Sequence, residues 1–464
     1  MSDQEPSGHT DRQRSPSVAA FLSFLWPGLG QLYVGRRRAA LVFALPVFIL
    51  VLVAAHELLP GLEMFALSMV SPKYVLAVLA VIVLDGLWRA LSLLHAYISG
   101  ARRVRPRSRI EGGVVAGLLI AVLAIHLVPG YYAWSAYAAE SEISASSGSA
   151  FDDAGPLETP NPSDIPPMTL PMYGVWITPN PSAIHDRRET FLIVGVDSGR
   201  AGLDSGNTDT MMLVSLDLDT NKVSMISVPR DTTMFQLYWN HATLGPTFKL
   251  NKLSAAIRWK SYASGDDPMT TLEKEIGFIL GIPVDYYVSI NLSGFEIMIN
   301  TVGGVDVVNP HAFYDETMLR GWPAGQIHLN GSDARAYVQT RHGDNDYNRA
   351  ARQQAVIIAL EKKLSSPSML AKLPRFLSAA GKTIKTDYPL EWVKDRAILA
   401  RSLPADAIRN CVLGPPYSIH KPMYETGGKW TSELDMGLVA SLSVYMFGQD
   451  SAYYGTAEPK PCAS

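Results

Sequence analysis

Cysteine is scarce in this sequence, with only Cys411 and Cys462 among 464 residues. Neither has a second cysteine or a histidine at the spacing of a zinc-binding motif, which argues against a zinc site. In an oxidising compartment outside the cytoplasm, the two could form a disulfide that ties the end of the chain back to the preceding domain.

Charged residues are also few, at 18% of the chain, and they nearly cancel to a net charge of −3. A general nucleic-acid-binding protein needs an excess of basic side chains, so the composition argues against that class and no nucleic acid is expected as a partner. The first 140 residues are mostly apolar and contain two basic runs, GRRRAA and ARRVRPRSRI. A cleaved signal peptide is not predicted, because no short apolar region with a small-residue cleavage site precedes them.

Three apolar runs, at 39–55, 74–98 and 113–137, approach the ~20 residues that span a hydrocarbon core. An earlier apolar stretch, 18–35, is interrupted by a Pro-Gly pair and predicts a half-buried or re-entrant segment. Arginine clusters precede the first and third runs, whereas the loop between the first two has a single lysine. The three runs predict a multi-pass membrane protein. The positive-inside rule places both arginine clusters in the cytoplasm, and the chain after residue 137 then lies outside it.

Asp85 and Arg89 lie four residues apart within the second run and can pair across one helical turn. Such a pair raises the idea of a transport function. Because no other acid accompanies it in the apolar runs, a structural ion pair or a contact with a neighbouring helix is the favoured interpretation.

Four regions follow from these patterns. Residues 1–137 are expected to form the membrane region. Residues 138–187 are rich in Ser, Pro, Asp and Glu without periodicity, which predicts an extracytoplasmic stalk. In 188–388, strand-like runs alternate with helical segments, which predicts an α/β domain with a mixed central β-sheet sandwiched by helices. Residues 389–464 are expected to form a C-terminal extension that packs on this domain or follows it.

Charged side chains stand at the ends of the predicted strands. Asp197 closes the first strand, Asp209 precedes the second, and Arg230 and Asp231 close the third. Asp197 and Asp209 could share a Mg²⁺ ion, because hard cations bind carboxylate and phosphate oxygens together. Carboxylates and arginines in one place are typical of phosphoryl-transfer sites.

A second polar cluster occurs in the segment QTRHGDNDYNRAARQQAVIIAL, residues 339–360. A helix is predicted to begin near Asp346, with Arg349, Arg352 and Gln353 near one face and the aliphatic run as its buried anchor. Guanidinium groups at a helix N-terminus suit phosphate binding. A solvated face with helical ion pairs is the alternative explanation of this pattern.

The chain resembles the LytR–CpsA–Psr family over roughly residues 189–365. The segments that carry the resemblance are FLIVGVDS, NTDTMMLVSLDLDTNKVSMISVPRDT, NKLSAAI, VDYYVSINLSGFEIMINTVGGVDVV, LNGSDARAYVQTRH and DYNRAARQQAVI. The resemblance implies a membrane-anchored enzyme of the bacterial cell membrane that moves a glycopolymer from a polyprenyl-pyrophosphate carrier to peptidoglycan, with Mg²⁺ (or Mn²⁺) as cofactor. It also implies an apolar channel for the polyprenyl chain between sheet and helices, and the lipid bilayer as a further partner.

The resemblance also implies roles for individual residues. Asp197 and Asp209 would be the metal-associated pair, and Lys252 fits the family's basic position better than Lys249 does. The residues implied as catalytic are Asp197, Asp209, Arg230, Asp231, Arg341 and Arg349. Those implied to bind pyrophosphate are Arg230, Lys252, Arg341, Asp346, Arg349 and Gln353.

Two positions depart from the family, because Asn207 and Gln339 stand where it usually has arginine. An amide can donate to a phosphate oxygen but carries no charge, so each change would weaken pyrophosphate binding by ~1–3 kcal/mol unless another group such as Arg200 compensates. Three membrane runs, where the family commonly has one, are a further departure. A lipid pyrophosphatase, a non-catalytic receptor for polyprenyl phosphate or glycopolymer, and a transporter or scaffold remain alternatives.

Overall fold

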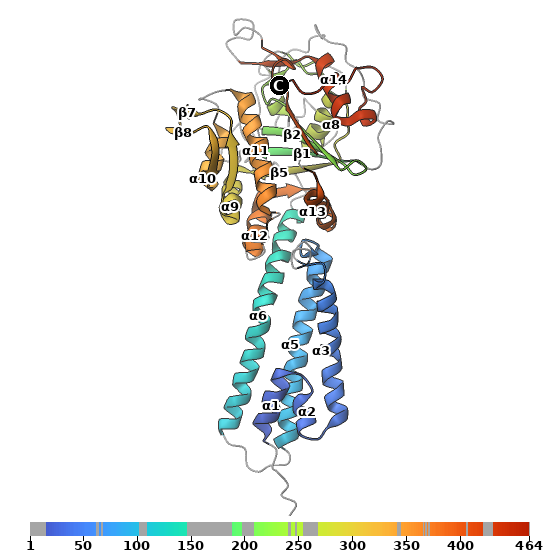
Figure 1. The fold of residues 1–464 in the computed structure, drawn as a ribbon, viewed down its shortest axis with the longest axis vertical. Coiled ribbons are helices and arrows are strands. Elements are labelled where there is room, and N and C mark those ends of the chain that lie inside the picture. Colours follow the sequence, from blue (N-terminus) through green and yellow to red (C-terminus); the bar gives the residue numbers. More distant parts are fainter. Residues whose placement is uncertain are drawn as a thin grey trace, which may run out of the picture. The chain divides into compact units, whose positions relative to one another are not determined.

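The chain folds as two compact units, Met1–Tyr137 and Ala138–Ser464 (Figure 1). The structure, a computed structural model, describes residues 15–61, 65, 68–101, 109–145, 188–196, 208–239, 243–245, 248–253, 268–340, 345–364, 366, 369, 372–404, 407–420 and 430–463. Most of the predicted stalk, 146–187, therefore lies outside the described residues. Its first part, 138–145, is helical and continues the last helix of the apolar region.

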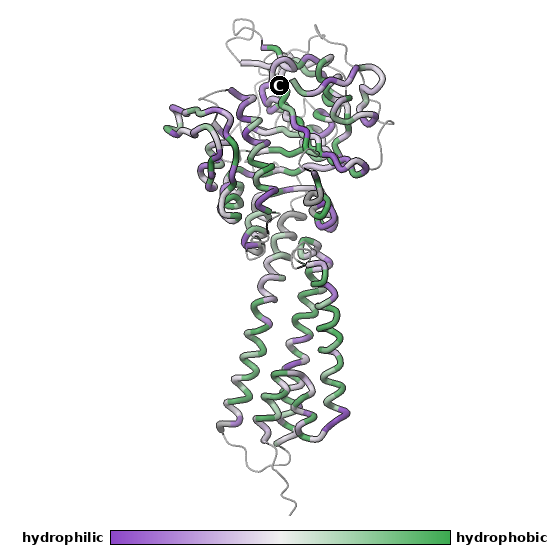
Figure 2. Tube along the Cα trace, viewed as in Figure 1, coloured by the Kyte–Doolittle hydropathy of each residue, from purple (hydrophilic) through white to green (hydrophobic). Residues whose placement is uncertain are grey.

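The first unit consists of helices, three of which are long and apolar enough to cross a membrane. Their apolar character is visible along most of their length (Figure 2). These three coincide with the three apolar runs of the sequence. The described helices are α1 (Pro16–Leu25), α2 (Leu29–Tyr33), α3 (Arg37–Leu58), α5 (Pro72–Ala101) and α6 (Arg109–Ala145).

The interrupted segment at the start of this unit forms two short helices, α1 and α2. Gly28 separates them in a left-handed conformation, with φ of 103°, and a side chain at this position would meet the backbone oxygen of Ala40. On α2, the buried Gln31 donates from Nε2 to the backbone oxygen of Ser92 at 2.9 Å and accepts from Ser23 Oγ at 2.9 Å. These hydrogen bonds fasten the broken segment to α5 and satisfy a buried amide.

Asp85 and Arg89 pair on α5, with Arg89 Nε 2.7 Å from Asp85 Oδ2. His126 of α6 joins the pair, because its Nε2 lies 3.0 Å from the same carboxylate oxygen. The histidine ring lies against Gly86, where an added Cβ would be 3.3 Å from the ring. The ion pair is thus also a contact between helices, consistent with the structural interpretation of the sequence.

The second unit is built on a six-stranded sheet of order β10-β5-β1-β2-β3-β11. β1 pairs with β5 and β3 with β11 in parallel, whereas the other neighbours are antiparallel, so the predicted mixed sheet is confirmed. The strands are β1 (Arg188–Val196), β2 (Thr208–Asp217), β3 (Lys222–Ser227), β5 (Tyr286–Asn291), β10 (Ile384–Thr386) and β11 (Ile408–Val412).

Helices cover both faces of this sheet, as the sequence predicts. On one face, alternate residues of β1 such as Leu192 and Val194 pack with α8 and α14 in the larger apolar core. On the other face lie α9, α10, α11 and α12, whose core includes Ile299, Tyr337 and Val356. The helices are α8 (Pro268–Leu280), α9 (Leu292–Val302), α10 (Gly331–Gln339), α11 (Asp346–Leu364), α12 (Leu373–Thr383), α13 (Val393–Ser402) and α14 (Met436–Phe447).

Smaller sheets complete the unit. One of them has the order β12-β13-β4 and joins the segment after β3 to the C-terminal extension, two regions about 200 residues apart in sequence. The remaining elements are β4 (Thr232–Thr233), η4 (Leu250–Lys252), β6 (Val305–Asn309), β7 (Phe313–Asp315), β8 (Arg320–Trp322), β9 (Gly325–Leu329), η7 (Leu390–Trp392), β12 (Ser418–Ile419), β13 (Ser432–Leu434) and η8 (Gly448–Asp450).

Candidate anion-binding pocket

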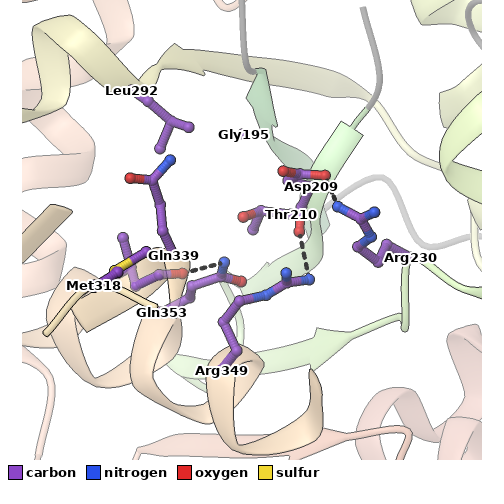
Figure 3. Close-up of a pocket in the computed structure, with 10 residues that line it drawn as sticks. Gly195, Asp209, Thr210, Arg230, Leu292, Met318, Gln339, Arg349 and Gln353 are labelled. Carbon is purple, nitrogen blue, oxygen red and sulfur yellow. Dashed lines mark hydrogen bonds and ion pairs between the residues drawn. The ribbon is translucent and has the colours of Figure 1, made fainter. Parts of the chain in front are cut away.

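A pocket of about 150 Å³ lies at one edge of the main sheet (Figure 3). β1 and β3 run parallel to each other and β2 runs against them, so the ends of β1 and β3 and the start of β2 meet there. A shift in register at Gly195/Val196 marks this edge, and such irregularities often redirect side chains beside functional sites. The lining residues are Gly195, Asp209, Thr210, Arg230, Leu292, Met318, Val338, Gln339, Arg349 and Gln353.

Asp209 and Arg230 form one wall of the pocket. Asp209 is the second residue of β2, and Arg230 Nη1 forms an ion pair with its carboxylate. Behind Arg230, the buried Asp231 places Oδ1 3.5 Å from Arg230 Nε and 2.8 Å from Lys249 Nζ. Lys249 therefore neutralises the carboxylate that lies next to Arg230, a role that the sequence did not predict for it. Lys252 belongs to η4, but its side chain lies outside the described residues.

Arg349 and Gln353 form the facing wall, from the first two turns of α11. The helix begins at Asp346, as the sequence predicts. Asp346 Oδ1 lies 2.6 Å from Arg349 Nη2, which also donates to the backbone oxygen of Asp209 at 3.2 Å. The amide of Gln353 donates to the backbone oxygen of Val338 at 3.1 Å. These contacts hold two mostly buried side chains at the pocket.

Arg352 does not line this pocket, although the sequence placed it on the same polar stripe. Its guanidinium lies 4.5 Å from the centre of the Phe313 ring and donates to the backbone oxygens of Tyr337 at 2.8 Å and Thr340 at 2.6 Å. A position three residues from Arg349 is turned about 60° around the helix. That rotation is enough for an aromatic face and two carbonyls to hold Arg352 away from the pocket.

Gln339 lies in the pocket at the last position of α10. Its side-chain oxygen accepts a hydrogen bond from Arg335 Nε at 3.3 Å, so a guanidinium from the same helix orients the amide. The predicted site residues Asp197 and Arg341, together with Asn207 and Arg200, lie outside the described residues.

Sequence reasoning did not single out the apolar residues that line the pocket, Leu292, Met318 and Val338. Met318 comes from the turn between β7 and β8, where the buried Asp315 accepts from the backbone N–H groups of Thr317 at 2.8 Å and Met318 at 2.9 Å. The sequence DETM signals such a turn. It does not signal where the turn lies, since the hairpin is placed by packing of Phe313 and Trp322 against α10.

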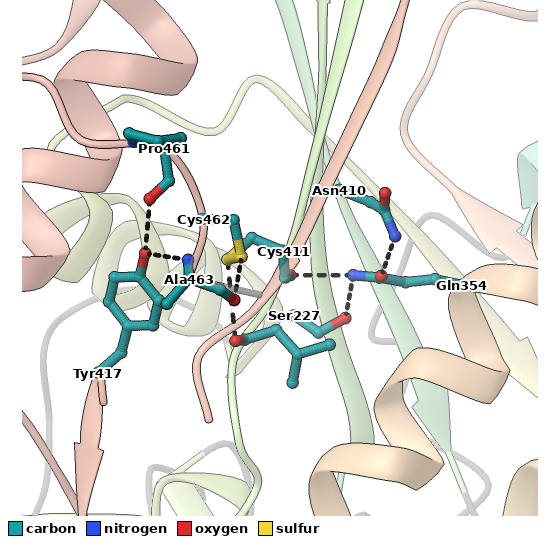
Figure 4. The surroundings of a disulfide bond; sticks show 9 residues. Ser227, Gln354, Asn410, Cys411, Tyr417, Pro461, Cys462 and Ala463 are labelled. Atoms are coloured by element: carbon teal, nitrogen blue, oxygen red, sulfur yellow. Dashed lines mark hydrogen bonds between the residues drawn. A yellow bond between two sulfur atoms is a disulfide. The ribbon is translucent and has the colours of Figure 1, made fainter. Parts of the chain in front are cut away.

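A disulfide supports the opposite side of α11. Cys411 of β11 is bonded to Cys462, as the two-cysteine count suggested (Figure 4). The buried Gln354 of α11 donates to the backbone oxygen of Cys411 at 3.0 Å and to Ser227 Oγ at 2.9 Å. Cys411 on the edge strand β11 therefore joins two other parts of the unit. The disulfide connects it to the C-terminal tail, and the hydrogen bond from Gln354 connects it to α11.

The second unit is an α/β sandwich: a mixed sheet covered by helices on both faces. Its candidate site is a polar pocket at the strand ends. The family model described as the LytR_cpsA_psr family matches residues 176–411, more than half of the chain. The chain belongs to this family, as its motifs indicate.

Two curated proteins that are similar to this chain are named as teichoic acid transferases. The chain is 32% identical over 207 residues to the polyisoprenyl-teichoic acid–peptidoglycan teichoic acid transferase TagV of Bacillus subtilis (strain 168), with 43% of this chain and 49% of that protein covered. It is 32% identical over 202 residues to the corresponding transferase TagU of a Bacillus cereus strain, with 43% and 60% covered. The chain thus spans about half of the length of one curated relative and less than two thirds of the other.

Solved structures also resemble the chain. The crystal structure of B. subtilis TagV has a TM-score of 0.45 and 23% identity, and it covers 57% of this chain and 98% of its own. A structure of TagT bound to LI-WTA has a TM-score of 0.43 and 21% identity, with 58% and 92% covered.

Proposed function

We propose that this protein is a membrane-anchored phosphotransferase that moves a glycopolymer from a polyprenyl-pyrophosphate carrier to peptidoglycan in the bacterial cell envelope. One observation carries the proposal: Arg230 and Arg349 reach a single pocket from the sheet and from α11, and both contact Asp209, Arg230 at its carboxylate and Arg349 at its backbone oxygen. Family membership and the names of the relatives support the same activity.

The pocket suits a diphosphate group. Two guanidiniums can each donate paired hydrogen bonds to phosphate oxygens, and both are held by carboxylates that pre-set their orientation. Arg349 also lies in the first turn of α11, where the helix dipole favours an anion. The amides of Gln339 and Gln353 supply uncharged donors on the side of the pocket away from Arg230 (Figure 3).

The residues present fit a magnesium ion bound jointly with the substrate. Mg²⁺ is commonly held by one or two carboxylates together with phosphate oxygens, and Asp209 presents a carboxylate to the pocket. Asp209 would hold the ion, together with Asp197 as the sequence predicts. When bound, the ion would neutralise charge on the diphosphate. Within the described residues no group of three or more His, Cys, Asp or Glu side chains is assembled to hold a metal by itself.

Asp209 is better placed than Asp231 to orient the attacking hydroxyl. Both carboxylates pair with Arg230, but Asp231 is buried and also engages Lys249, whereas Asp209 borders the pocket. In the proposed step, a peptidoglycan hydroxyl attacks the phosphorus that carries the sugar, and a new P–O bond forms. The bond to polyprenyl phosphate breaks, polyprenyl phosphate leaves, and the hydroxyl proton passes to the carboxylate.

The lipid chain needs a separate apolar surface, because a pocket of about 150 Å³ is smaller than the ~300 Å³ at which sites for small ligands begin. Beside the pocket, Ile193 of β1 and Val288 and Ile290 of β5 line one sheet face and are only partly buried. We propose that this apolar strip, together with Leu292 and Met318 at the pocket, accepts the first part of the polyprenyl chain.

The proposed location is the bacterial cell membrane, with α3, α5 and α6 crossing the bilayer and the second unit outside the cytoplasm. Arginine runs before the first and third of these helices support this orientation. The Cys411–Cys462 disulfide is consistent with an oxidising compartment.

A transfer assay with the full chain in nanodiscs tests the proposal. With Mg²⁺, a short-chain polyprenyl-pyrophosphoryl disaccharide and peptidoglycan oligomers, we expect disaccharide phosphate on the oligomers and release of polyprenyl phosphate. Arg349→Ala should lower the rate about a hundredfold, because it removes charged hydrogen bonds worth ~1.5–3 kcal/mol each. Arg375→Ala, exposed on α12, is the control and should have no effect.

The products separate the proposal from its alternatives. Release of free disaccharide phosphate without transfer would identify a pyrophosphatase. Binding of the donor with no release of polyprenyl phosphate would identify a receptor. Either result would overturn the transferase assignment.

A further inference from the structure

Three ionisable side chains meet between α5 and α6, far from the ends of both helices. Arg89 Nε lies 2.7 Å from Asp85 Oδ2, and His126 Nε2 lies 3.0 Å from the same oxygen. Each of the three side chains is less than a quarter exposed. If α5 and α6 cross the bilayer as proposed, this cluster lies well inside the hydrocarbon region, where ionisable groups are costly and are commonly functional.

The contacts of the His126 ring restrict its protonation. Nδ1 lies 2.7 Å from the backbone oxygen of Val122, and Nε2 lies 3.0 Å from Asp85 Oδ2. A carbonyl oxygen can only accept a hydrogen bond, so Nδ1 carries a hydrogen and donates it. An ionised carboxylate is also only an acceptor, and a neutral imidazole has a single N–H. A neutral ring beside an ionised Asp85 would therefore set a nitrogen lone pair against a carboxylate oxygen.

One additional proton removes this conflict. Either His126 is an imidazolium that donates from both ring nitrogens, or Asp85 is protonated and donates from Oδ2 to Nε2. The two arrangements contain the same number of protons. Both hold one proton more than a neutral histidine with an ionised aspartate, and both leave the cluster with the single positive charge of one added cation.

A metal ion fits this position less well than a proton does. The Arg89 guanidinium already donates to Asp85 Oδ2, and its charge would repel a metal cation at that oxygen. Within the described residues, no group of three or more His, Cys, Asp or Glu side chains is assembled to hold a metal. A proton needs only the two atoms that already face each other.

The helices packed around the cluster bring no further charge close to it in the part of the chain that the structure describes. α3 contacts this part of α5 through the backbone oxygen of Phe43, which accepts from Trp88 Nε1 at 3.1 Å. The ionisable residues of α3 lie toward its two ends, and α1 has none. On α5, His95 lies ten positions beyond Asp85, ~15 Å along the helix, and its ring packs on Phe43.

On α6, the ionisable residues nearest to His126 in sequence are Glu111 and Tyr131. Glu111 lies fifteen positions before the histidine, ~22 Å along the helix, and Tyr131 is an exposed phenol five positions after it. Arg89 is therefore the charged group that acts most strongly on the pair of Asp85 and His126.

The added proton also affects how α6 is held on α5. The ring of His126 lies against Gly86, where an added Cβ would be 3.3 Å from it. With the proton present, a charge-assisted hydrogen bond joins the two helices at this close approach. Without it, Asp85 and Arg89 remain as an ion pair on α5 alone, and the facing lone pairs of His126 and Asp85 repel each other.

We propose that Asp85, Arg89 and His126 form a proton-binding site within the membrane region, and that the bound proton fastens α6 to α5. Binding adds one proton from solvent to the pair of His126 and Asp85, and no other reactant is needed. The proposal does not depend on the proposed function, because no residue of the pocket takes part in it.

The test measures the proton directly in the full chain in nanodiscs at pH 7.5, where an ordinary histidine is mostly neutral. Nitrogen-15 NMR of labelled histidine rings reports the state of His126, whose signals are assigned by their loss in His126→Gln. Infrared spectra of the parent chain and Asp85→Asn report a protonated carboxyl at Asp85. We expect an imidazolium at His126 or a protonated carboxyl at Asp85.

Two variants sharpen this test. In Asp85→Asn, the amide can donate to Nε2, so the His126 ring should become neutral at the same pH. The matched control is His56→Gln, an exposed histidine of α3, which should leave the His126 signals unchanged. A neutral His126 ring together with an ionised Asp85 in the parent chain would overturn the proposal. An imidazolium that persists in Asp85→Asn would also overturn it.

Spin labels test whether the proton fastens the helices. Leu84→Cys on α5 and Leu127→Cys on α6 place labels at two exposed positions, and the native cysteines are occupied by their disulfide. Raising the pH until the His126 signals show loss of the proton should lengthen the distance between the labels. His126→Gln donates to Asp85 without titrating, so its distance should not change with pH. An unchanged distance after the proton has left the parent chain would overturn the fastening role.

Discussion

Lys249, Asp231 and Arg230 form a chain of charges behind the pocket. Lys249 Nζ lies 2.8 Å from the buried Asp231 carboxylate, which in turn lies 3.5 Å from Arg230. Because only Arg230 lines the pocket, the other two residues act by setting the position of its guanidinium. At the scale of single residues, the site therefore depends on side chains that a ligand would never touch.

Lys249→Met removes the partner of a buried carboxylate and should lower the free energy of unfolding by ~2 kcal/mol. It should also weaken binding of a polyprenyl pyrophosphate, since Asp231, the neighbour of Arg230, loses the cation that holds it in place. Thermal unfolding and Kd measurements on the full chain test both effects. Lys249→Met with Asp231→Asn removes both charges and should recover most of the stability; a double variant as unstable as the single one would contradict the pairing.

Glu275 of α8 is a fully buried acid within the larger core. Burial raises its pKa from 4.5 to about 8, although the Tyr238 backbone N–H donates to its Oε2 at 3.1 Å. The folded chain therefore keeps a proton that the unfolded chain releases above about pH 5. Stability should fall between pH 5 and pH 8, by at most about 1.4 kcal/mol per pH unit, and then level off.

Glu275→Gln keeps the shape of the side chain without the titration. It should raise the thermal midpoint at pH 7.5 more than at pH 5.5, measured on the full chain in one detergent. An equal shift at the two pH values would show that Glu275 does not hold a proton in the folded state.

Helix α11 is the element whose sequence was most informative. Its start at Asp346, the inward position of Arg349 and the burial of Val356 and Ala359 in the aliphatic run follow from helical spacing and capping. The direction of Arg352 does not follow, because Phe313 and Tyr337, which attract it, belong to other elements. Local pattern thus predicts the helix and its polar face, and tertiary contacts decide which charge enters the pocket.

Across the rest of the chain, too, local patterns predict the elements but not the contacts between distant segments. The mixed sheet and its helices could be predicted from alternating patterns, and Asp85 with Arg89 from spacing. His126, 41 residues from Asp85, and the pairing of β4 with β13 could not, since no periodicity connects such distant segments.

The Cys411–Cys462 disulfide joins the C-terminal tail to an edge strand and, through Gln354, to α11. Replacing both cysteines by serine should lower the free energy of unfolding by ~2–4 kcal/mol, because the crosslink limits the unfolded chain across 51 residues. The thermal midpoint with and without reductant measures this. If reductant lowers the midpoint of the double-serine variant as much as that of the parent chain, the effect does not come from the disulfide.

The contact of α5 with α6 depends on room at Gly86 for the His126 ring. Gly86→Leu would place a large side chain where a Cβ is already 3.3 Å from that ring, and should separate the two helices locally. The expected result is a lower thermal midpoint in nanodiscs. Gly112→Leu, where an added Cβ meets nothing within 4 Å, is the control and should leave it unchanged.

At the scale of the whole molecule, apolar helices and an α/β unit share one chain. If α3, α5 and α6 cross the membrane as proposed, protease added outside intact spheroplasts should digest the second unit and leave a fragment that contains the first. Protection of the second unit until the membrane is broken would contradict the proposed orientation.

The central claim is that the pocket between Arg230 and Arg349 holds the diphosphate of a polyprenyl carrier. The most direct measurement is mass spectrometry of lipid that copurifies with the full chain from bacterial membranes, compared between the parent chain and Arg349→Ala. We predict a polyprenyl phosphate or pyrophosphate in the parent and its loss in the variant, with Arg375→Ala unchanged. Equal retention of the lipid by Arg349→Ala would contradict the claim.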